Sequence, residues 1–368
     1  MKIKILNDNG TINIHNTDKL TQNSTDNEIR FINSSSKEQN TIDIIKAYKS
    51  NKKTILFDNT NKILSKKLDE LNLDIFKNKD FSMMFFTSGT TGNPLGALKT
   101  KENLEEEIKV FTQLIKQYDI KQVIVTVPFI HIYGTLLGLL FPLFNNIDII
   151  LKEHFLPNNL LEVIEENSLI VTTPLYIKSL NKITQNKDLK SSLFISSTAP
   201  LNSDDTKEFL NKFNTNIIQL FGSTETSGIA YKKDTQVLWT PLDKVNISVN
   251  SKNELKIKSP FVSNILFENN FINTKAEIQT FDYVEIEKNK FKLIGRSSKI
   301  FKIAGKRYST IQIENILEEI YEIQKALVFV ENNDDKLRDE ILNITLESKK
   351  EFSSKEIKNI LKEKISNL

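Results

Sequence analysis

The residues best suited to chemistry lie in one short stretch, FFTSGTTGNPLGALKT, at residues 85–100. Glycine is scarce, with 10 in 368 residues, yet Gly89, Gly92 and Gly96 fall within eight positions. The hydroxyl residues beside them are Thr87, Ser88, Thr90 and Thr91. Glycines let successive main-chain N–H groups converge on an anion, and hydroxyl groups add donors for phosphate oxygens. The stretch therefore predicts a loop that binds a polyphosphate, and a solvated turn of the same composition is the alternative.

The patterns on either side indicate how this loop is held. FSMMFF, residues 81–86, has the composition of a buried strand, and KENLEEEI, residues 101–108, begins a helical pattern. The loop is therefore expected in a strand-to-helix connection, which is where α/β sheets bind ligands. It lacks the Gly-Lys-Ser or Gly-Lys-Thr ending that the phosphate loop of nucleoside triphosphatases requires.

Strand and helix patterns alternate through most of the chain, which predicts an α/β domain with a parallel sheet. An alternating pattern around Asn9 and Gly10 is typical of a tight hairpin at the start. From about Trp239, short strands separated by turn residues predict a β-rich part, and helices and strands mix beyond Gly295. We therefore expect a large α/β domain with a β-rich subdomain at residues 1–295, and a small α+β domain at residues 296–368.

Composition narrows the classes of function. The 50 basic and 47 acidic side chains nearly cancel, to a net charge of +3, so nothing in the charge suggests a nucleic acid partner. The chain has no cysteine, which excludes cysteine nucleophiles and thiolate metal sites, and its three histidines are too widely spaced to suggest zinc. No apolar signal core begins the chain, and no apolar run reaches the roughly 20 residues of a membrane span. We expect a cytoplasmic protein with no membrane span.

The order T-S-G-T-T-G-x-P-x-G, at residues 87–96, resembles the signature of the adenylate-forming superfamily. That superfamily comprises acyl- and aryl-CoA synthetases, the adenylation domains of peptide synthetases, and luciferases. The resemblance recurs in the family's order along nearly the whole chain. The further matching segments are PFIHIYG at 128–134, SSTAPL at 196–201, FGSTET at 221–226, ELKIKSP at 254–260, TFD at 280–282 and GRSSKIFKIAGKRYSTIQIE at 295–314. The resemblance implies a large domain of stacked sheets and helices with a small mobile lid domain, in a short acyl- or aryl-acid ligase branch of the family.

The family's reaction has two halves, and the resemblance implies ATP and Mg²⁺ for the first. A carboxylate attacks the α-phosphate of ATP to give an acyl-adenylate and pyrophosphate, and a thiol then displaces AMP. Residues 87–92 are implied to hold the β- and γ-phosphates, so that pyrophosphate leaves with its charge stabilised. Thr224 is implied to contact the α-phosphate, and Glu225 to coordinate magnesium, a hard cation that prefers carboxylate and phosphate oxygens. A helix start is the alternative interpretation of a Ser-Thr-Glu sequence.

Other residues are implied to bind the rest of the nucleotide. Phe221 stands where many relatives have Tyr, and its ring would stack on adenine, with Gly222 and Ala199 also at the nucleotide. Asp282 and Arg296 would reach the two ribose hydroxyls, one as acceptor and the other as donor. Without the resemblance, these residues would be assigned to the core or to the surface.

The acid and the thiol have their own implied residues. His131 is at a position where relatives line the acyl pocket near the reacting carbonyl, and a structural histidine is the alternative. The Asp-containing segment that receives the amine in amino-acid-activating relatives is absent, which favours a simple small carboxylic acid. Lys302, in KIAGKR at 302–307, is implied to line the approach of the thiol. That thiol would belong to CoA or to phosphopantetheine, so an acyl carrier protein is a candidate partner.

Three departures from the family pattern keep two classes of function open. Leu95 replaces the lysine of Gly-x-Pro-Lys-Gly, with Lys99 and Lys101 as candidate substitutes. The region before the loop is short, as in o-succinylbenzoate-CoA ligases, and the chain stops at Leu368 before the family's C-terminal Gly-Lys, so we expect a truncated lid. One class is an ATP-dependent acid–thiol ligase, which includes an o-succinylbenzoate-CoA ligase-like enzyme. The other is a degenerate nucleotide- or acyl-adenylate-binding protein. The enzyme is favoured because the chain retains Thr224, Glu225, Asp282 and Arg296.

Overall fold

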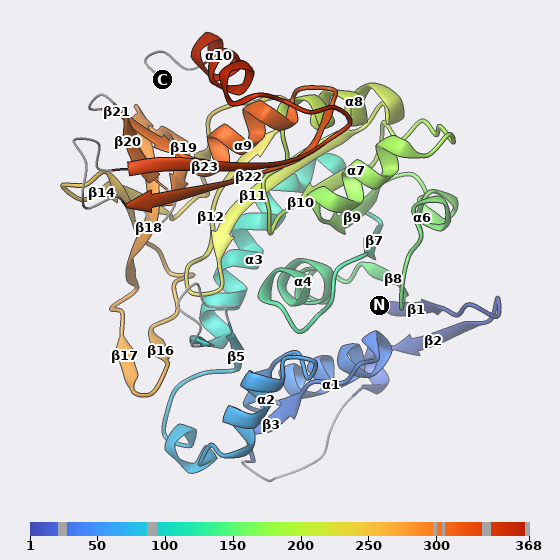
Figure 1. Ribbon diagram of the computed structural model, residues 1–368. Coiled ribbons are helices and arrows are strands. Elements are labelled where there is room, and N and C mark those ends of the chain that lie inside the picture. Colours follow the sequence, from blue (N-terminus) through green and yellow to red (C-terminus); the bar gives the residue numbers. More distant parts are fainter. Residues whose placement is uncertain (21–27, 87–93, 297–299, 304–305, 333–339, 365–368) are drawn as a thin grey trace. The chain divides into compact units, whose positions relative to one another are not determined.

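A computed structural model describes residues 1–20, 28–86, 94–296, 300–303, 306–332 and 340–364 (Figure 1). The chain forms two compact units. The first unit comprises Met1–Asn246 and Ile257–Ile278, and the second comprises Ile247–Lys256 and Gln279–Leu368. The expected boundary between the two domains, at residues 295–296, stays a prediction. The two compact units are divided at other positions in the chain.

A nine-stranded sheet forms the larger part of the first unit. Its order is β13-β12-β11-β10-β9-β7-β8-β1-β2. Six neighbouring strands run parallel: β11 (Asn216–Ser223), β10 (Leu193–Ser196), β9 (Ser168–Thr172), β7 (Gln122–Val125), β8 (Asp148–Lys152) and β1 (Lys2–Leu6). The antiparallel strands at the two edges are β2 (Ile12–Asn16), β12 (Ser227–Lys233) and β13 (Thr240–Pro241). This parallel centre confirms the α/β prediction.

The first two strands form the hairpin that Asn9 and Gly10 predict. Gly10 has a φ of +82°, and the main-chain N–H of Asn7 donates to the carbonyl of Thr11 at 2.9 Å. Glycine adopts this left-handed conformation without steric cost. The turn residues therefore fix the register of β1 against β2.

The interior strands of the sheet are buried on both faces. In β10, Leu193 and Ile195 join one apolar cluster, while Phe194 joins another. Because side chains alternate along a strand, these clusters lie on opposite faces of the sheet. The second cluster is built with α6 (Pro157–Val163), α7 (Pro174–Lys182) and α8 (Ser203–Phe213). Such continuous apolar strands are typical of a parallel sheet covered by helices.

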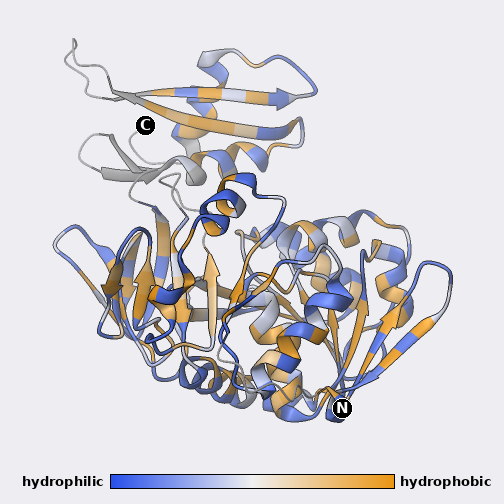
Figure 2. Ribbon diagram, turned by 90° about the horizontal axis from the view of Figure 1, so that it is seen from below, coloured by the Kyte–Doolittle hydropathy of each residue, from blue (hydrophilic) through white to orange (hydrophobic). Residues whose placement is uncertain are grey.

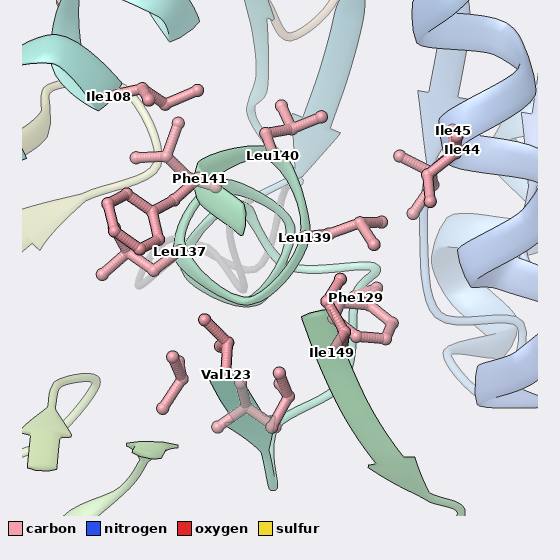
Figure 3. Packing of buried hydrophobic residues seen from close by; sticks show 14 of the residues in the cluster. Ile44, Ile45, Ile108, Val123, Phe129, Leu137, Leu139, Leu140, Phe141 and Ile149 are labelled. Atoms are coloured by element: carbon pink, nitrogen blue, oxygen red, sulfur yellow. The ribbon is translucent and has the colours of Figure 1, made fainter. Parts of the chain in front are cut away.

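The first cluster is the main core of the first unit (Figure 3). It joins the nine-stranded sheet to α1 (Lys37–Lys49), α3 (Lys101–Ile115) and the helical segment at residues 132–145. That segment consists of α4 (Ile132–Thr135), a π-helical turn (Leu136–Leu140) and α5 (Phe141–Asn145). Figure 3 shows Leu137, Leu139 and Phe141 from this segment among side chains of the neighbouring elements.

A six-stranded sheet completes the first unit. Its order is β17 (Phe271–Asn273), β16 (Ile265–Phe267), β6 (Gly96–Lys99), β5 (Met83–Phe86), β4 (Thr54–Leu56) and β3 (Arg30–Ile32). Because β5 and β6 are antiparallel, residues 87–93 connect two strands. The expected strand-to-helix connection was therefore wrong. The short segment GALK forms a buried strand, with α3 following it, because it pairs with β5 on one side and β16 on the other. Helix α2 (Lys62–Asp69) packs its leucines into the apolar cluster of this sheet.

The β-rich part is a four-stranded sheet that lies mostly in the second unit. Its strands are β14 (Asn246–Val249), β15 (Glu254–Lys258), β18 (Glu277–Glu287) and β19 (Lys290–Arg296). The hairpins β20 (Ile300–Ile303) with β21 (Lys306–Ser309), and β22 (Ile323–Asn332) with β23 (Glu340–Ser348), follow. Helices α9 (Thr310–Glu318) and α10 (Ser354–Lys364) supply apolar residues to the same small core as β22 and β23. The mixed α+β character of the C-terminal part matches the expectation.

Hydropathy follows the elements in both units. In Figure 2 helices carry hydrophobic residues along one side and hydrophilic residues along the other. This amphipathic pattern is typical of helices that pack one face against a core. Across the described ranges of the chain, no helix combines the length and the apolar character that crossing a membrane requires.

Candidate functional site

Several of the predicted site residues lie at one edge of the nine-stranded sheet in the first unit. His131 follows β7 and Ala199 follows β10, while Phe221 and Gly222 lie in the last part of β11. Because β7, β9, β10 and β11 are parallel, the segments that leave their carboxyl ends emerge at the same edge. The structure thus brings these segments together, at the position where open α/β sheets bind ligands.

The segment after β7 is fastened across this edge by side chains of its own. Thr126 Oγ1 donates to the carbonyl of Val171 at 3.2 Å, and it lies 2.9 Å from Thr172 Oγ1. The hydroxyl of Tyr133 lies 2.9 Å from the carbonyl of Thr172 and 2.8 Å from that of Ile195. The segment is therefore tied to the ends of β9 and β10.

The PFIHIYG motif ends in glycine for a steric reason. A Cβ atom at Gly134 would lie 2.1 Å from the carbonyl oxygen of Pro128, so the chain can close there only without a side chain. His131, between them, directly precedes α4 as its N-cap residue, and it is exposed. Partial desolvation by the protein behind it lowers the pKa of His131, against the opposing effect of the Asp58 carboxylate. Its place beside an acyl group stays a prediction.

Phe221, near the end of β11, forms an aromatic pair with Trp239. The ring of Phe221 packs against Trp239 with centroids 5.5 Å apart and planes tilted by 46°, and the Lys232 amine lies 5.0 Å from the Trp239 centroid. Directly after the neighbouring strand β10, Ser197 Oγ donates to the carbonyl of Leu220 at 3.1 Å, which holds the segment that leads to the exposed Ala199. Trp239 is the only tryptophan of the chain, and the sequence alone gave no reason to assign it to the site. The contact of Phe221 with adenine stays a prediction.

Thr224 and Glu225 lie in the turn that joins β11 to β12. The strands are antiparallel, so the alternative of a helix start was wrong. Ser223 and Thr226 close the turn, because the N–H of each donates to the other's hydroxyl oxygen, at 3.1 and 3.2 Å. Among the described residues, nothing donates a hydrogen bond to Glu225 Oε2, although this oxygen is buried. A buried carboxylate oxygen without a donor is costly, and it fits a cation ligand. Glu225 is therefore suited to magnesium.

A buried lysine and a buried glutamate lie against this turn. The Nζ of Lys99 donates to the main-chain carbonyls of Glu225 at 3.0 Å and Phe261 at 2.7 Å, and its side chain has 0% exposure. Glu107 Oε1 accepts from the main-chain N–H of Gly228 at 2.8 Å. Burial lowers the pKa of Lys99 to about 7, against the opposing effects of Glu107 and Glu225, and burial raises the pKa of Glu107. Sequence reasoning did not assign either residue to this turn.

The two lysines considered as substitutes for the position of Leu95 already have partners. The amine of Lys99 donates to the carbonyls described above, and that of Lys101 donates to Asn51 Oδ1 at 2.9 Å. The predicted phosphate-binding residues 87–92 themselves lie outside the described residues. Lys302 is part of β20, opposite Arg307, and its side chain lies outside the described structure.

Asp282 and Arg296 form a pair within the second unit. They are opposite each other on β18 and β19, and Arg296 Nε donates to Asp282 Oδ1 at 3.2 Å. The aspartate is 7% exposed, and its main-chain N–H donates to Thr280 Oγ1 at 3.1 Å. The contacts of Asp282 and Arg296 with ribose hydroxyls stay a prediction.

Known proteins resemble the chain in sequence. The profile of the family described as AMP-binding enzyme matches residues 12–260. VraA of Staphylococcus aureus, a putative long chain fatty acid-CoA ligase, is 26% identical over 260 residues, which cover 66% of this chain and 56% of VraA. The 3,4-dihydroxybenzoate–[aryl-carrier protein] ligase of Bacillus anthracis is 24% identical over 258 residues, which cover 67% of this chain and 58% of the ligase. The chain thus spans a little more than half the length of these curated relatives.

Solved structures resemble the chain in fold. O-succinylbenzoate coenzyme A synthetase (MenE) from Bacillus subtilis, in complex with AMP, has a TM-score of 0.76 at 16% identity. The match covers 92% of this chain and 82% of the synthetase. The same synthetase in complex with ATP and a magnesium ion has a TM-score of 0.74, also at 16% identity. At these identities the likeness concerns the fold, and it confirms the expected fold class.

Proposed function

The chain belongs to the AMP-binding enzyme family, and from that premise we propose that it activates a carboxylic acid with ATP and passes the acyl group to a thiol. In the first step, a carboxylate oxygen bonds to the α-phosphorus of ATP while the bond from that phosphorus to the bridging oxygen breaks. The products are an acyl-adenylate and pyrophosphate. In the second step, a thiolate sulfur bonds to the acyl carbon and the AMP oxygen leaves with its electron pair, which gives a thioester and AMP.

One observation carries this proposal, and it is the geometry of the turn after β11. The turn holds Thr224 and Glu225 at the carboxyl edge of the parallel sheet, and among the described residues Glu225 Oε2 is buried without a hydrogen-bond donor. Magnesium usually binds one or two carboxylates together with substrate phosphates, and it would neutralise phosphate charge here. Glu225 would hold this cation and Thr224 would bind the α-phosphate. The loop at residues 87–92 would hold the phosphates that leave.

The acid is proposed to be a small acyl or aryl acid. His131 would line its pocket, and because the pKa of His131 is lowered from an already near-neutral value, its imidazole is mostly uncharged at pH 7. An uncharged lining suits an acid whose body is apolar and carries no second charge. One curated relative is named for an aryl acid, which supports the aryl part of this range, whereas the other is named for a long chain fatty acid, which is larger than the acid proposed here.

The thiol is proposed to belong to CoA or to the phosphopantetheine of an acyl carrier protein. One curated relative is named as a CoA ligase and the other as a carrier-protein ligase, so both acceptors have support. Lys302 would line the approach of this thiol, and Asp282 and Arg296 would bind the ribose of the nucleotide. ATP and both thiols are supplied in the cytoplasm, where we place the reaction.

A second candidate is a protein that binds a nucleotide or an acyl-adenylate and has lost the first step. Leu95 favours it, because an apolar side chain stands where the family has a cation, and the amines of Lys99 and Lys101 are engaged elsewhere. Loss of a cation that acts mainly on the transition state slows the chemistry while it leaves binding intact. This candidate predicts AMP binding without turnover.

Trapping of the activated acid separates the two candidates. The 368-residue chain is incubated with ATP, magnesium, hydroxylamine and a panel of aryl, short-acyl and long-acyl acids, and the hydroxamate is measured. A hydroxamate with one class of acid, dependent on ATP, supports the enzyme and identifies the acid. Tight AMP binding without a hydroxamate from any acid supports the second candidate. CoA and a phosphopantetheinylated carrier protein are then compared as acceptors, by mass analysis of the thioester.

A further inference from the structure

Lys99 and Glu107 hold the two ends of one short turn by its main chain. Lys99 Nζ donates to the carbonyl of Glu225, which also accepts from the main-chain N–H of Ser263 at 2.9 Å. Three residues further on, Glu107 Oε1 accepts from the N–H of Gly228. The turn is thus held on one side from β6, the strand that follows residues 87–93, and on the other side from α3.

Glycine at position 228 is part of this contact. A Cβ atom there would lie 2.8 Å from Glu107 Oε1 and 2.7 Å from Leu242 Cδ1. Between the two held positions, Ser227 has a φ of +60°, a left-handed conformation that non-glycine residues seldom adopt. The main chain therefore follows one defined path from Glu225 to Gly228, and the two buried side chains help to fix that path.

A purely structural role explains this pair poorly. Buried charges are costly, and apolar residues of similar volume usually stabilise a core as well or better. Within the described structure the amine and the carboxylate do not form a direct ion pair, and each is hydrogen-bonded to main-chain atoms at the turn. One of the residues held in this way is Glu225, whose Oε2 is buried and without a donor among the described residues, as is Glu107 Oε2.

We propose that Lys99 and Glu107 are positioning residues, which fix the turn at residues 225–228 and thereby direct the Glu225 carboxylate at the magnesium ion. This inference rests on the proposed function, because it takes Glu225 as the metal ligand. Residues that orient a ligand control metal affinity, although they do not touch the metal. Lys99 thus does not replace the phosphate-loop lysine by reaching a phosphate. It acts through the main chain of the residue that binds the cation.

The test compares two kinds of nucleotide binding by calorimetry. AMP binding without metal reports whether the nucleotide site is folded. Binding of the non-hydrolysable analogue α,β-methylene-ATP at increasing magnesium concentration gives the half-saturating concentration of the metal. The variants are Lys99→Met, Glu107→Met and Glu107→Gln. The matched control is Lys37→Met, because Lys37 is another buried lysine of the first unit that donates to two main-chain carbonyls, of Val125 and Lys152.

For Lys99→Met and Glu107→Met we expect the half-saturating magnesium concentration to rise by about tenfold or more, with AMP affinity changed by about twofold or less. Glu107→Gln keeps an oxygen that can accept from Gly228, so its effect should be smaller than that of Glu107→Met. Lys37→Met should leave both quantities at the wild-type value. AMP affinity that stays near the wild-type value in these variants separates the effect on magnesium from a general loss of stability.

Three outcomes would overturn the inference. One is an unchanged magnesium requirement in a Lys99→Met protein that still binds AMP. Another is a loss that is equal for AMP and for the magnesium-dependent analogue, which would assign a structural role. The third is a wild-type protein that binds the analogue without magnesium. If Lys99→Met does not fold, the comparison of Glu107→Met with Glu107→Gln decides in the same way. These binding measurements need no turnover, so they test the positioning role even if no acid yields a hydroxamate. The absence of any hydroxamate would refute the proposed function and would leave the role of Lys99 and Glu107 to the binding data.

Discussion

Replacement of Lys37 by Met should remove a defined part of the rise in stability between pH 7 and pH 10. Lys37 lies at the start of α1, its side chain is 8% exposed, and its Nζ donates to the carbonyls of Lys152 at 3.3 Å and Val125 at 3.4 Å. Burial lowers the pKa of this amine to about 8, and the Glu153 carboxylate opposes that effect only in part. The unfolded chain returns the amine to its ordinary value of 10.5.

The sign and the size of the effect follow from these two pKa values. Below pH 8 the amine is charged in both states, and the folded state carries the whole cost of burying the charge. Between pH 8 and 10.5 the unfolded state binds more protons than the folded state, so the free energy of unfolding rises with pH. Linkage over this window gives a gain of about 2.5 kcal/mol between pH 7 and pH 10. Met carries no proton there, so the variant should lack this gain.

Urea unfolding measured by tryptophan fluorescence provides the assay. Trp239 is the only tryptophan, and it lies in the first unit together with Lys37, so its signal reports the unfolding of the correct unit. Other groups titrate equally in both proteins, and the difference between wild type and variant isolates Lys37. A difference that stays constant from pH 7 to pH 10 would show that the buried amine does not have a lowered pKa.

Three further predictions concern single residues of the site. Gly134→Ala should lower the free energy of unfolding by about 1–3 kcal/mol in the same urea assay, because the new methyl group meets the Pro128 carbonyl, and an unchanged midpoint would contradict the steric argument. Phe221→Ala should weaken AMP binding by about 1–3 kcal/mol if its ring stacks on adenine, whereas equal affinity in calorimetry would leave the ring a role only with Trp239. The wild type should prefer ATP to 2′,3′-dideoxy-ATP by about tenfold or more, and Asp282→Ala should lose this preference; retention of the preference would remove the aspartate from the ribose site.

The elements with continuous apolar runs were predictable from local sequence. The central strands of the nine-stranded sheet are buried on both faces, and their composition alone indicates this. The strand β6 was not predictable in the same way. Its four residues include a glycine and a lysine, and it is held by pairing with β16, where Leu98 is opposite Ile265. Such a partner, distant in the sequence, leaves no local signal.

The candidate site shows the same division between local and distant information. Thr224 and Glu225 could be proposed from the sequence because the FGSTET motif marks them, and their roles at the nucleotide stay a prediction. Lys99 and Glu107 could not, because their burial depends on the packing of the whole first unit. One signal was present for Glu107, which shares a helix face with the buried Leu104 and Phe111 at helical spacing. A carboxylate on an otherwise apolar helix face indicates a buried hydrogen-bond donor that pairs with it.

Exchange of labelled pyrophosphate into ATP reports the first step and its metal ligand together. It is measured with magnesium and the acid that gives the strongest hydroxamate, on the wild type, on Glu225→Gln and on the control Glu208→Gln, which changes an exposed glutamate of α8. We expect exchange in the wild type and in the control, and only background exchange in Glu225→Gln, which should still bind AMP. Exchange at the wild-type rate in Glu225→Gln would contradict the assignment of the metal ligand. No exchange in the wild type with this acid would contradict the first step itself.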